Sequence, residues 1–440
     1  MHLNLTNMKR LILVLLPLLF NITCTNKRAS LTWWFEAANP NQRQWLNELM
    51  EVPFETMYPE YDLSIDYRGS TLDQQLRVAL LSGSGPDIIQ TPGPGYLATM
   101  VQAGQLMPLD KYAAEFGWTD RILDFFLNMG KYDGKLYFLP KTYETIGLFY
   151  NSKMFEDNGW DIPKTIQEME EIADEMITMN IVPFAAGSAD WRQASEWFVS
   201  IVFNSVAGPN NFYKAMNGEI PWTSQPFIDA VDKLKEWWDK GYFGANYHSL
   251  TIEQAFATLS DGTAAMAPTG TWSFQYIPTY FKGREDEVGF VGFPSAKGLP
   301  TPIYMLGIGS TFSIANNSSN PYGAAKAIDF MFSDKFYGDI NTVWQGEWNM
   351  PLRDLSKVTI GESVIPQYRS SMVNLANAVA KNQYGYTTWT FMPPATSNYL
   401  HSGIEEVWFD AIDSGEFLGK IDKLFQEEKA EGKVPAIPER

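Results

Sequence analysis

The chain has 440 residues, and this length favours two domains because single hydrophobic cores rarely grow beyond about 250–300 residues. Hydrophobic residues make up 45% and charged residues 19%, which excludes a disordered chain and a coiled coil. The net charge of −18 excludes the basic face that nucleic acid requires, and it disfavours docking on anionic lipid. Cys24 is the only cysteine and there are 3 histidines, so we expect no disulfide, no metal site and no cofactor.

The N-terminal segment has the pattern of an export signal. Two basic residues precede an apolar stretch that ends at residue 20 and is too short to span a bilayer. Cys24 follows and resembles the acylated cysteine of bacterial lipoproteins, although the residues before it depart from the usual pattern. We predict a lipoprotein-type signal peptide over 1–24, a lipid anchor at Cys24 and a tether over 25–30. The alternative is a cysteine in a discarded peptide.

The first part of the mature chain alternates between strand and helix patterns. The expected elements are a strand at 31–35, a helix around 45–50, a strand at 61–68, a helix from 71 that stops at 82–85, and a strand at 86–91. This alternation predicts an α/β fold with a parallel sheet covered by helices. Ligands of such sheets bind at the carboxyl ends of the strands, so the loops 36–41 and 91–96 lie at the expected binding edge.

The same alternation continues from about residue 145. Thr165 and Glu168 form a capping box that opens a helix, and Pro321 marks another helix start. Short strands are expected near 181–187 and 263–268, a longer one or two at 302–316, and mostly helix over 371–440. No internal repeat or low-complexity segment is present.

Four stretches carry a family resemblance when they are taken in order. They are SGSGPDIIQTPGPGYLATMVQAGQLMPLD at 82–110, DGKLYFLPKTYETIGLFYNSKMFEDNG at 133–159, DGTAAMAPTGTW at 261–272 and GIGSTFSIANNSSNPYGAAKAIDFM at 307–331. Together they resemble the extracellular solute-binding proteins of ABC importers, and most closely the sugar-binding branch that includes maltose-binding protein. The resemblance covers essentially all of 31–430.

The resemblance implies a two-lobed, type II-like periplasmic-binding-protein fold, in which each lobe is a sheet flanked by helices and three crossover segments form the hinge. The implied crossovers lie near 141–146, 303–309 and 348–353. The implied lobes are 31–142 plus 308–349 for lobe one and 145–304 plus 352–430 for lobe two. It also implies a monomer at the cell envelope that binds a carbohydrate and docks on the permease subunits of an ABC importer.

Two residues are implied as ligand contacts by their positions in the family pattern. An acidic residue at the position of Glu144 lies in the hinge and faces the ligand, where a carboxylate accepts hydrogen bonds from sugar hydroxyls. A tryptophan at the position of Trp272 stacks on a sugar ring, whose apolar face suits an aromatic surface. The alternatives are a solvated or salt-bridged hinge glutamate and a core tryptophan.

Further candidates stand at predicted strand ends and in loops. They are Trp34, Glu36 and Asn39 after the first strand, Thr91 in the loop 91–96, Tyr143 beside Glu144, Trp191 after a strand–loop, Gly270 before Trp272, Glu347 and Trp348 near the third crossover, and Trp389 in a β-prone loop. Gly93 and Gly95 allow two interpretations, a close backbone approach to ligand or a plain tight turn. Packing between lobes is the favoured alternative for the segment 344–349.

The sequence contains no motif that selects an enzyme. Nucleophile-elbow, zinc-protease and phosphate-loop patterns are absent from the 440 residues, and no particular pair of carboxylates stands out. We therefore predict a binding protein that captures an oligosaccharide or glycoside by hinge closure. The alternatives are a secreted carbohydrate-active hydrolase on a TIM-like barrel and a binding protein for a non-sugar solute such as a polyamine, metal or peptide.

Overall fold

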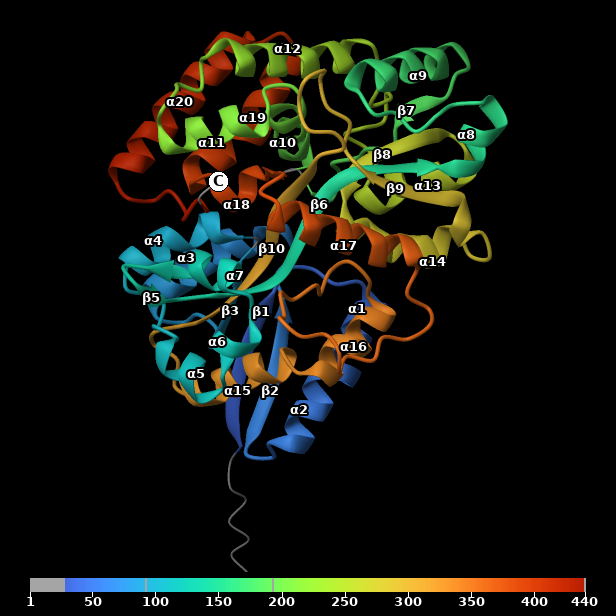
Figure 1. Ribbon diagram of the computed structural model, residues 1–440. Coiled ribbons are helices and arrows are strands. Elements are labelled where there is room, and N and C mark those ends of the chain that lie inside the picture. Colours follow the sequence, from blue (N-terminus) through green and yellow to red (C-terminus); the bar gives the residue numbers. More distant parts are fainter. Residues whose placement is uncertain (1–27, 92, 192–193, 439–440) are drawn as a thin grey trace, which may run out of the picture.

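The computed structural model describes residues 28–91, 93–191 and 194–438. These residues form two α/β lobes, one above the other in Figure 1. A mixed sheet runs through both, with the strand order β2-β1-β3-β10-β6-β8-β7, while β11 pairs with β10 and β9 pairs with β6. The strands are β1 (Ala29–Phe35), β2 (Tyr61–Tyr67), β3 (Ile88–Thr91), β6 (Leu139–Asn151), β7 (Val182–Phe184), β8 (Ala264–Gly270), β9 (Val288–Gly292), β10 (Tyr304–Ile314) and β11 (Tyr384–Tyr386), with a separate hairpin of β4 (Lys131–Tyr132) and β5 (Lys135–Leu136). Cys24 lies outside the described residues.

The first lobe begins as the sequence predicts. Strand β1 pairs in parallel with both β2 and β3. Trp33 packs into the core beside Phe312 and Trp348, with ring centroids 5.6 and 6.2 Å away, and Trp34 belongs to the cluster on the other face. The helices of this part are α1 (Pro40–Leu46) and α2 (Val52–Met57), joined by a π-helical turn over Asn47–Glu51, then α3 (Leu72–Ser82), α4 (Leu97–Gln102), α5 (Asp110–Glu115), α6 (Trp118–Arg121), α7 (Asp124–Met129), α15 (Pro321–Met331) and α16 (Asp334–Val343).

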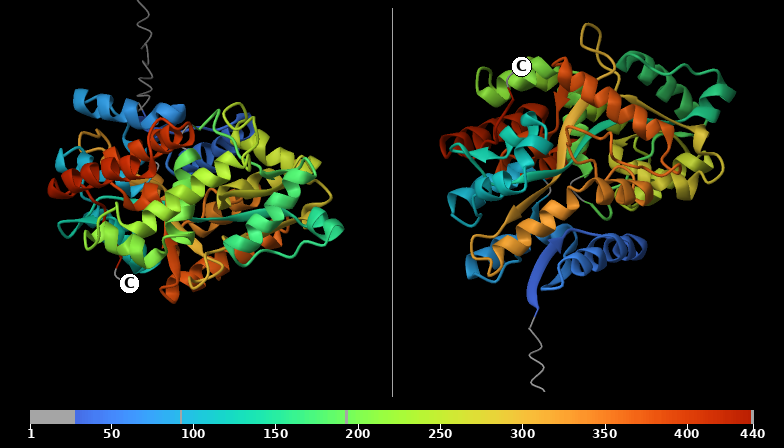
Figure 2. Two further views of the ribbon diagram at one scale, coloured as in Figure 1. Left: turned by 90° about the horizontal axis from the view of Figure 1, so that it is seen from above. Right: turned by 60° about the horizontal axis from the view of Figure 1, so that its bottom comes forward.

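The second lobe is richer in helix. Its helices are α8 (Ser152–Asn158), α9 (Ile166–Thr178), α10 (Ala194–Ser205), α11 (Pro209–Asn217), α12 (Gln225–Asp239), α13 (Ile252–Asp261), α14 (Ile277–Tyr280), α17 (Pro366–Ala380), α18 (Thr388–Phe391), α19 (Pro394–Trp408) and α20 (Ser414–Ala430). The capping box predicted at Thr165 and Glu168 opens α9. Figure 2 shows helices on both sides of the strands.

Two long strands pass from one lobe to the other. Strands β6 and β10 are antiparallel, and Gly307 lies opposite Glu144 in their register. The third segment runs beside them, because the Tyr143 N–H donates to the Asn349 carbonyl oxygen at 2.9 Å. The three segments expected as crossovers therefore lie side by side (Figure 1). The lobe boundaries given above remain a prediction.

The local structure around Trp389 differs from expectation, because this residue sits on the short helix α18 rather than in a β-type loop. The pairing of β11 with β10 ends at Tyr386, opposite Leu306. Beyond it, the Ile308 N–H of β10 donates at 2.8 Å to the Thr390 hydroxyl. A side chain thus takes the place of the next backbone acceptor on the neighbouring segment, whose backbone continues as the helix α18.

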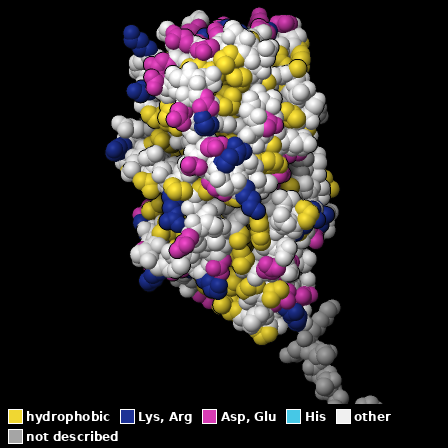
Figure 3. Space-filling view, turned by 90° about the vertical axis from the view of Figure 1, so that its right-hand side faces the viewer, with side chains coloured by type: hydrophobic (Ala, Val, Ile, Leu, Met, Phe, Trp, Pro, Cys, Tyr) yellow, Lys and Arg dark blue, Asp and Glu magenta, His cyan; other side chains and the backbone are white. Residues whose placement is uncertain are grey.

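No helix among the described residues is both long enough and apolar enough to cross a membrane. On the face shown in Figure 3, acidic and basic side chains are interspersed with apolar ones.

Candidate ligand-binding cleft

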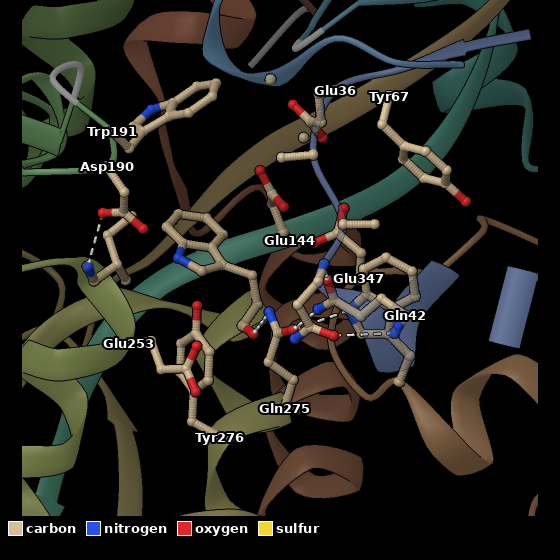
Figure 4. A pocket seen from close by; sticks show the side chains of 18 of the residues that line it. Glu36, Gln42, Tyr67, Glu144, Asp190, Trp191, Glu253, Gln275, Tyr276 and Glu347 are labelled. Carbon is tan, nitrogen blue, oxygen red and sulfur yellow. Dashed lines mark hydrogen bonds between the residues drawn. The ribbon is translucent and has the colours of Figure 1, made fainter. Parts of the chain in front are cut away.

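A cavity of about 500 Å³ opens between the two lobes (Figure 4). Strands β1 and β2 end at it, which is the carboxyl edge where ligands of parallel sheets bind. Helices α10 and α13 and the 3₁₀ segment Thr271–Tyr276 face it from the other side. Its lining comprises Glu36, Ala37, Ala38, Asn39, Gln42, Arg43, Tyr67, Gly69, Tyr96, Glu144, Asp190, Trp191, Glu196, Trp197, Ile252, Glu253, Trp272, Gln275, Tyr276, Gly309, Trp344, Glu347 and Trp389.

Three carboxylates gather in this cavity around one buried lysine. Figure 4 shows Glu36, Glu144 and Glu347 close together. The Lys141 Nζ lies 2.7 Å from the Glu347 Oε1, and the lysine side chain has no exposed surface. Its ammonium also lies 4.4 Å from the ring centre of Trp348, so the positive charge is held between a carboxylate and an aromatic face.

Burial makes these carboxyl groups reluctant to ionise. Desolvation and the charge of Glu347 raise the pKa of Glu36 to about 7. The same two causes raise the pKa of Glu144 well above its ordinary value. The positive charge of Lys141 acts against both shifts. At neutral pH the cluster therefore holds protons as well as negative charge, and it can both donate and accept hydrogen bonds.

The place of Glu144 depends on a glycine in the neighbouring strand. Glu144 lies on β6 and is 4% exposed. A Cβ at Gly309 on β10 would come within 2.2 Å of the Glu144 Oε2, so only glycine leaves room for the carboxylate to lie across β10. The Trp389 side chain hydrogen-bonds to the same carboxylate and lowers its pKa.

Tryptophan rings form an apolar part of the cavity wall. The Trp272 ring centre lies 4.9 Å from that of Trp197, with 53° between the planes. It lies 5.9 Å from that of Trp389 in an edge-to-face arrangement. Trp191 and Trp344 also line the cavity. The arrangement can hold a molecule with one apolar face and a polar rim, because rings and carboxylates border the same space.

A family model for bacterial extracellular solute-binding proteins matches residues 37–336. The chain belongs to this family. The match confirms the resemblance read from the sequence, and the two lobes of the structure confirm the expected fold.

Individual relatives of this solute-binding protein are distant. An alpha-glucosides-binding periplasmic protein of Rhizobium meliloti is 24% identical over 308 residues, which are 61% of this chain and 63% of that protein. A galactooligosaccharide-binding protein of Bacillus subtilis is 34% identical over 272 residues, 60% of each chain. The chain thus spans less than two thirds of the length of these relatives.

Solved structures agree with the fold over nearly the whole chain. A structure from work on xylan utilisation by Caldanaerobius polysaccharolyticus has a TM-score of 0.79 at 20% identity and covers 90% of this chain and 99% of its own. A chitin oligosaccharide binding protein has a TM-score of 0.78 at 24% identity, with 92% and 99% covered.

The cavity brings together most of the residues that the sequence proposed as ligand contacts. Those on its lining are Glu36, Asn39, Glu144, Trp191, Trp272, Glu347 and Trp389. Asn39 also has a structural role, since its side chain accepts a hydrogen bond from the Gln42 N–H and caps α1. Their contact with ligand stays a prediction.

Five proposed residues do not line the cavity. The Trp34 ring is covered by the Arg68 guanidinium at 3.8 Å. Thr91 is fully buried, and its hydroxyl lies 2.7 Å from that of Thr311. Trp348 is fully buried in the lobe-one core.

The remaining two of these five residues, Tyr143 and Gly270, pack against neighbouring side chains. Tyr143 packs on Phe126, with ring centres 5.1 Å apart. At Gly270 a Cβ would lie 2.1 Å from the Trp272 ring, so this glycine makes room for the tryptophan.

The glycines after Thr91 serve a contact within the chain. A Cβ at Gly95 would lie 2.5 Å from the Met392 carbonyl oxygen, and one at Gly93 would lie 3.0 Å from that of Trp389. These glycines therefore allow the loop to approach α18. This differs from both interpretations given above, a close approach to ligand and a plain tight turn.

Several lining residues were not singled out from the sequence. They are Gln42, Arg43, Tyr67, Tyr96, Glu196, Trp197, Glu253, Gln275, Tyr276 and Trp344. A signal existed for two of them, because Gln275 and Tyr276 follow Trp272 within a single 3₁₀ segment. The start of α10 reaches the cavity only through tertiary packing, and no local pattern marks it.

Proposed function

We propose that this protein is the substrate-binding component of an ABC importer and captures a carbohydrate, an oligosaccharide or glycoside, between its two lobes. The observation that carries the proposal is the pairing of Trp272 and its neighbouring rings with the carboxylates of Glu36, Glu144 and Glu347 around one cavity. A pyranose has an apolar face of C–H groups and a rim of hydroxyls, and it needs both kinds of surface.

The ligands of several relatives support a sugar. These relatives include proteins that bind alpha-glucosides, galactooligosaccharides and maltotriose. The cavity volume of about 500 Å³ suits a ligand of a few sugar units and falls in the usual range for small-molecule sites.

The proposed mechanism is closure about the strands that cross between the lobes. Ligand contacts both lobes only in the closed form, so binding shifts the population towards that form. A shift from mostly open to mostly closed needs about 5 kcal/mol of differential binding. Ring stacking and several hydrogen bonds to hydroxyls supply energies of that order. The closed form then docks on the permease and releases the sugar.

Two further parts of the proposal concern the chain outside the cavity. The lobe boundaries follow the crossovers near 141–146, 303–309 and 348–353. Acylation at Cys24 would hold the protein at the outer face of a membrane, and the protein would act as a monomer. Its role is that of a binder without turnover, and the mixed sheet of the described residues offers no closed barrel for the hydrolase alternative.

The test is a thermal-shift and calorimetric screen of the purified protein against mono- and oligosaccharides. A ligand at a hundredfold excess over its Kd raises stability by about 2.7 kcal/mol. Trp272→Ala should abolish the shift. Trp238→Ala is the matched control, because Trp238 is also partly exposed but stacks on Trp408 away from the cavity, with ring centres 4.5 Å apart.

Three outcomes would contradict the proposal. A shift only with polyamines, amino acids or metal ions would keep the family and overturn the sugar. Equal loss of binding in both tryptophan variants would remove the site assignment. Release of shortened sugars during incubation would favour the hydrolase.

A further inference from the structure

A glutamine beside Trp272 joins the two lobes at the edge of the cavity. The Gln275 Oε1 accepts a hydrogen bond from the Gln42 Nε2 at 2.6 Å and another from the Trp344 Nε1 at 3.0 Å. The Gln275 Nε2 donates to the Trp272 carbonyl oxygen at 2.9 Å. Figure 4 shows Gln42 and Gln275 linked in this way.

The donors and acceptors of this contact are fixed by the surrounding groups. An indole nitrogen only donates, so Trp344 must meet the oxygen of the Gln275 amide, and the amide nitrogen is then turned to the Trp272 carbonyl. The Gln42 Oε1 is already occupied by the Asn39 N–H at 2.7 Å in the capping box of α1, which leaves its amide nitrogen for Gln275. The network has one consistent arrangement.

Both partners of Gln275 are rigidly held in lobe one. Gln42 is 9% exposed and Trp344 is 2% exposed. The Trp344 ring lies against Trp348, with centres 6.0 Å apart, and against Phe35 at 6.1 Å. Gln275 itself belongs to the 3₁₀ segment that carries Trp272 in lobe two. The contact therefore ties the lobe-one core to the candidate stacking residue.

The neighbouring backbone fits the same closed contact. A Cβ at Gly346 would lie 2.1 Å from the Thr271 carbonyl oxygen, so glycine permits the segment after Trp344 to meet the start of the 3₁₀ segment. Rotation of the lobes away from each other would separate these groups and break both hydrogen bonds that Gln275 accepts.

We propose that Gln275 is a positioning residue that couples the orientation of Trp272 to lobe closure and stabilises the closed form by contacts between the lobes themselves. The inference rests on the proposed closure, although not on the identity of the ligand. Ligand binding then completes a closure that Gln42 and Trp344 already favour. A ligand dissociates only after these two hydrogen bonds break, so Gln275 governs the dissociation rate.

The first experiment measures lobe separation in the absence of any ligand. Spin or fluorescent labels are placed at exposed Lys335 on α16 and Glu175 on α9, each replaced by cysteine in a Cys24→Ser background. Gln275→Leu should lengthen the distance distribution, and Gln42→Ala should do the same from the other lobe. Unchanged distributions in both variants would overturn the proposal, whatever the sugar screen yields.

A matched control separates closure from a general loss of hydrogen bonds. The Gln367 Nε2 donates to the Glu285 and Val288 carbonyl oxygens, at 3.1 and 3.0 Å, within lobe two. Gln367→Leu removes two hydrogen bonds without touching the lobe contact, so its distance distribution should match that of the wild type. An equal opening in this variant would count against a specific role of Gln275.

The second experiment uses stopped-flow kinetics with the sugar found in the screen. Two neutral hydrogen bonds correspond to a change of about tenfold or somewhat more in affinity. Gln275→Leu should raise the dissociation rate by that factor and leave the association rate within about twofold. Gln275→Glu keeps the acceptor for Gln42 and Trp344 but cannot donate to Trp272. The Gln275→Glu variant should keep the distance distribution of the closed form, although its ligand affinity should fall. A distribution as wide as that of Gln275→Leu would refute the coupling between Trp272 and lobe closure.

Discussion

Lys141 is the one basic side chain that the described structure places against the three cavity carboxylates, and its removal should destabilise the protein in a pH-dependent way. The Lys141 side chain is fully buried, and the Glu347 partner is 18% exposed. Lys141→Met keeps the length of the aliphatic part of the side chain and its packing on the Trp348 ring, but it removes the charge. In the wild type the centre of this ring lies 4.4 Å from the ammonium.

The expected loss follows from the charges that are left behind. Two opposite charges about 4 Å apart attract by about 4 kcal/mol at an effective dielectric constant of about 20. Breaking a buried ion pair from one side costs about 3–5 kcal/mol, because an uncompensated charge remains. At pH 8, where Glu36 is ionised, we expect a loss in this range. At pH 5, protons neutralise Glu36, so Lys141 opposes less negative charge and the loss should be smaller than at pH 8.

Urea unfolding followed by tryptophan fluorescence at pH 5 and pH 8 measures the difference. Lys335→Met is the control, since its side chain is 82% exposed and its pair with Asp339 lies on the surface. That variant should change stability by less than about 0.5 kcal/mol at both pH values. An equal loss for Lys141→Met at pH 5 and pH 8 would refute the reasoning, because the cost would then be independent of the ionisation of Glu36.

Three other predictions test the placement of single residues. Folding raises the pKa of Glu36 from 4.5 to about 7, so its contribution to stability is full below pH 4.5 and is lost as the pH rises through 7. In the wild type, ionisation of Glu36 should lower the free energy of unfolding by about 3 kcal/mol between pH 4.5 and 8, and Glu36→Gln should remove this decrease. An unchanged pH profile in the variant would contradict the raised pKa. Gly95→Val should cost about 2 kcal/mol in urea unfolding, because its Cβ would meet the Met392 carbonyl oxygen at 2.5 Å, and full stability would show that the loop can yield. Trp348→Phe should lower the melting temperature and reduce the free energy of unfolding by about 1–2 kcal/mol, because Trp348 is fully buried. Calorimetry should find that the ligand affinity changes less than threefold. A large loss of affinity would place Trp348 in the ligand site.

The elements of the fold were accessible from the sequence because their signals are local. The run at 31–35 lies within β1, and Thr165 and Glu168 open α9 as a capping box. The parallel start of the sheet followed from alternation alone. The two-lobed arrangement did not, since it requires β10 to pair with β3 and β6 across more than 150 residues of chain. That part came from the family resemblance.

The binding edge could be predicted for the same reason, because carboxyl ends of parallel strands meet at one edge. Glu36 and Asn39 lie there as expected. Residues on helices could not be found in this way. Trp197 and Glu253 reach the cavity because α10 and α13 pack with their first turns towards it, and neither helix carries a local sign of that orientation.

The segment 344–349 illustrates the limit of composition as a guide. Its two tryptophans are four residues apart, and the sequence predicted Trp348 as the ligand contact, which is the wrong one of the two for the cavity lining. The structure places Trp348 among Trp33, Phe35 and Phe336 in the core and leaves Trp344 on the cavity. Both rings are buried, and a helical period does not apply here because α16 ends at Val343, so only tertiary packing decides which ring borders the cavity.

The division of chemistry between the lobes explains why closure should matter for binding. Trp197, Trp272 and Trp389 belong to the proposed lobe two, while Glu36 and Glu347 belong to lobe one. A sugar bound to lobe two alone would stack on these rings but would lack the carboxylates of Glu36 and Glu347. A sugar bound to lobe one alone would meet these two carboxylates without the rings of Trp197, Trp272 and Trp389. Because the two lobes carry different residues of the cavity lining, a ligand in the closed form can make a set of contacts that neither open lobe offers alone, and we expect ligand binding to favour closure.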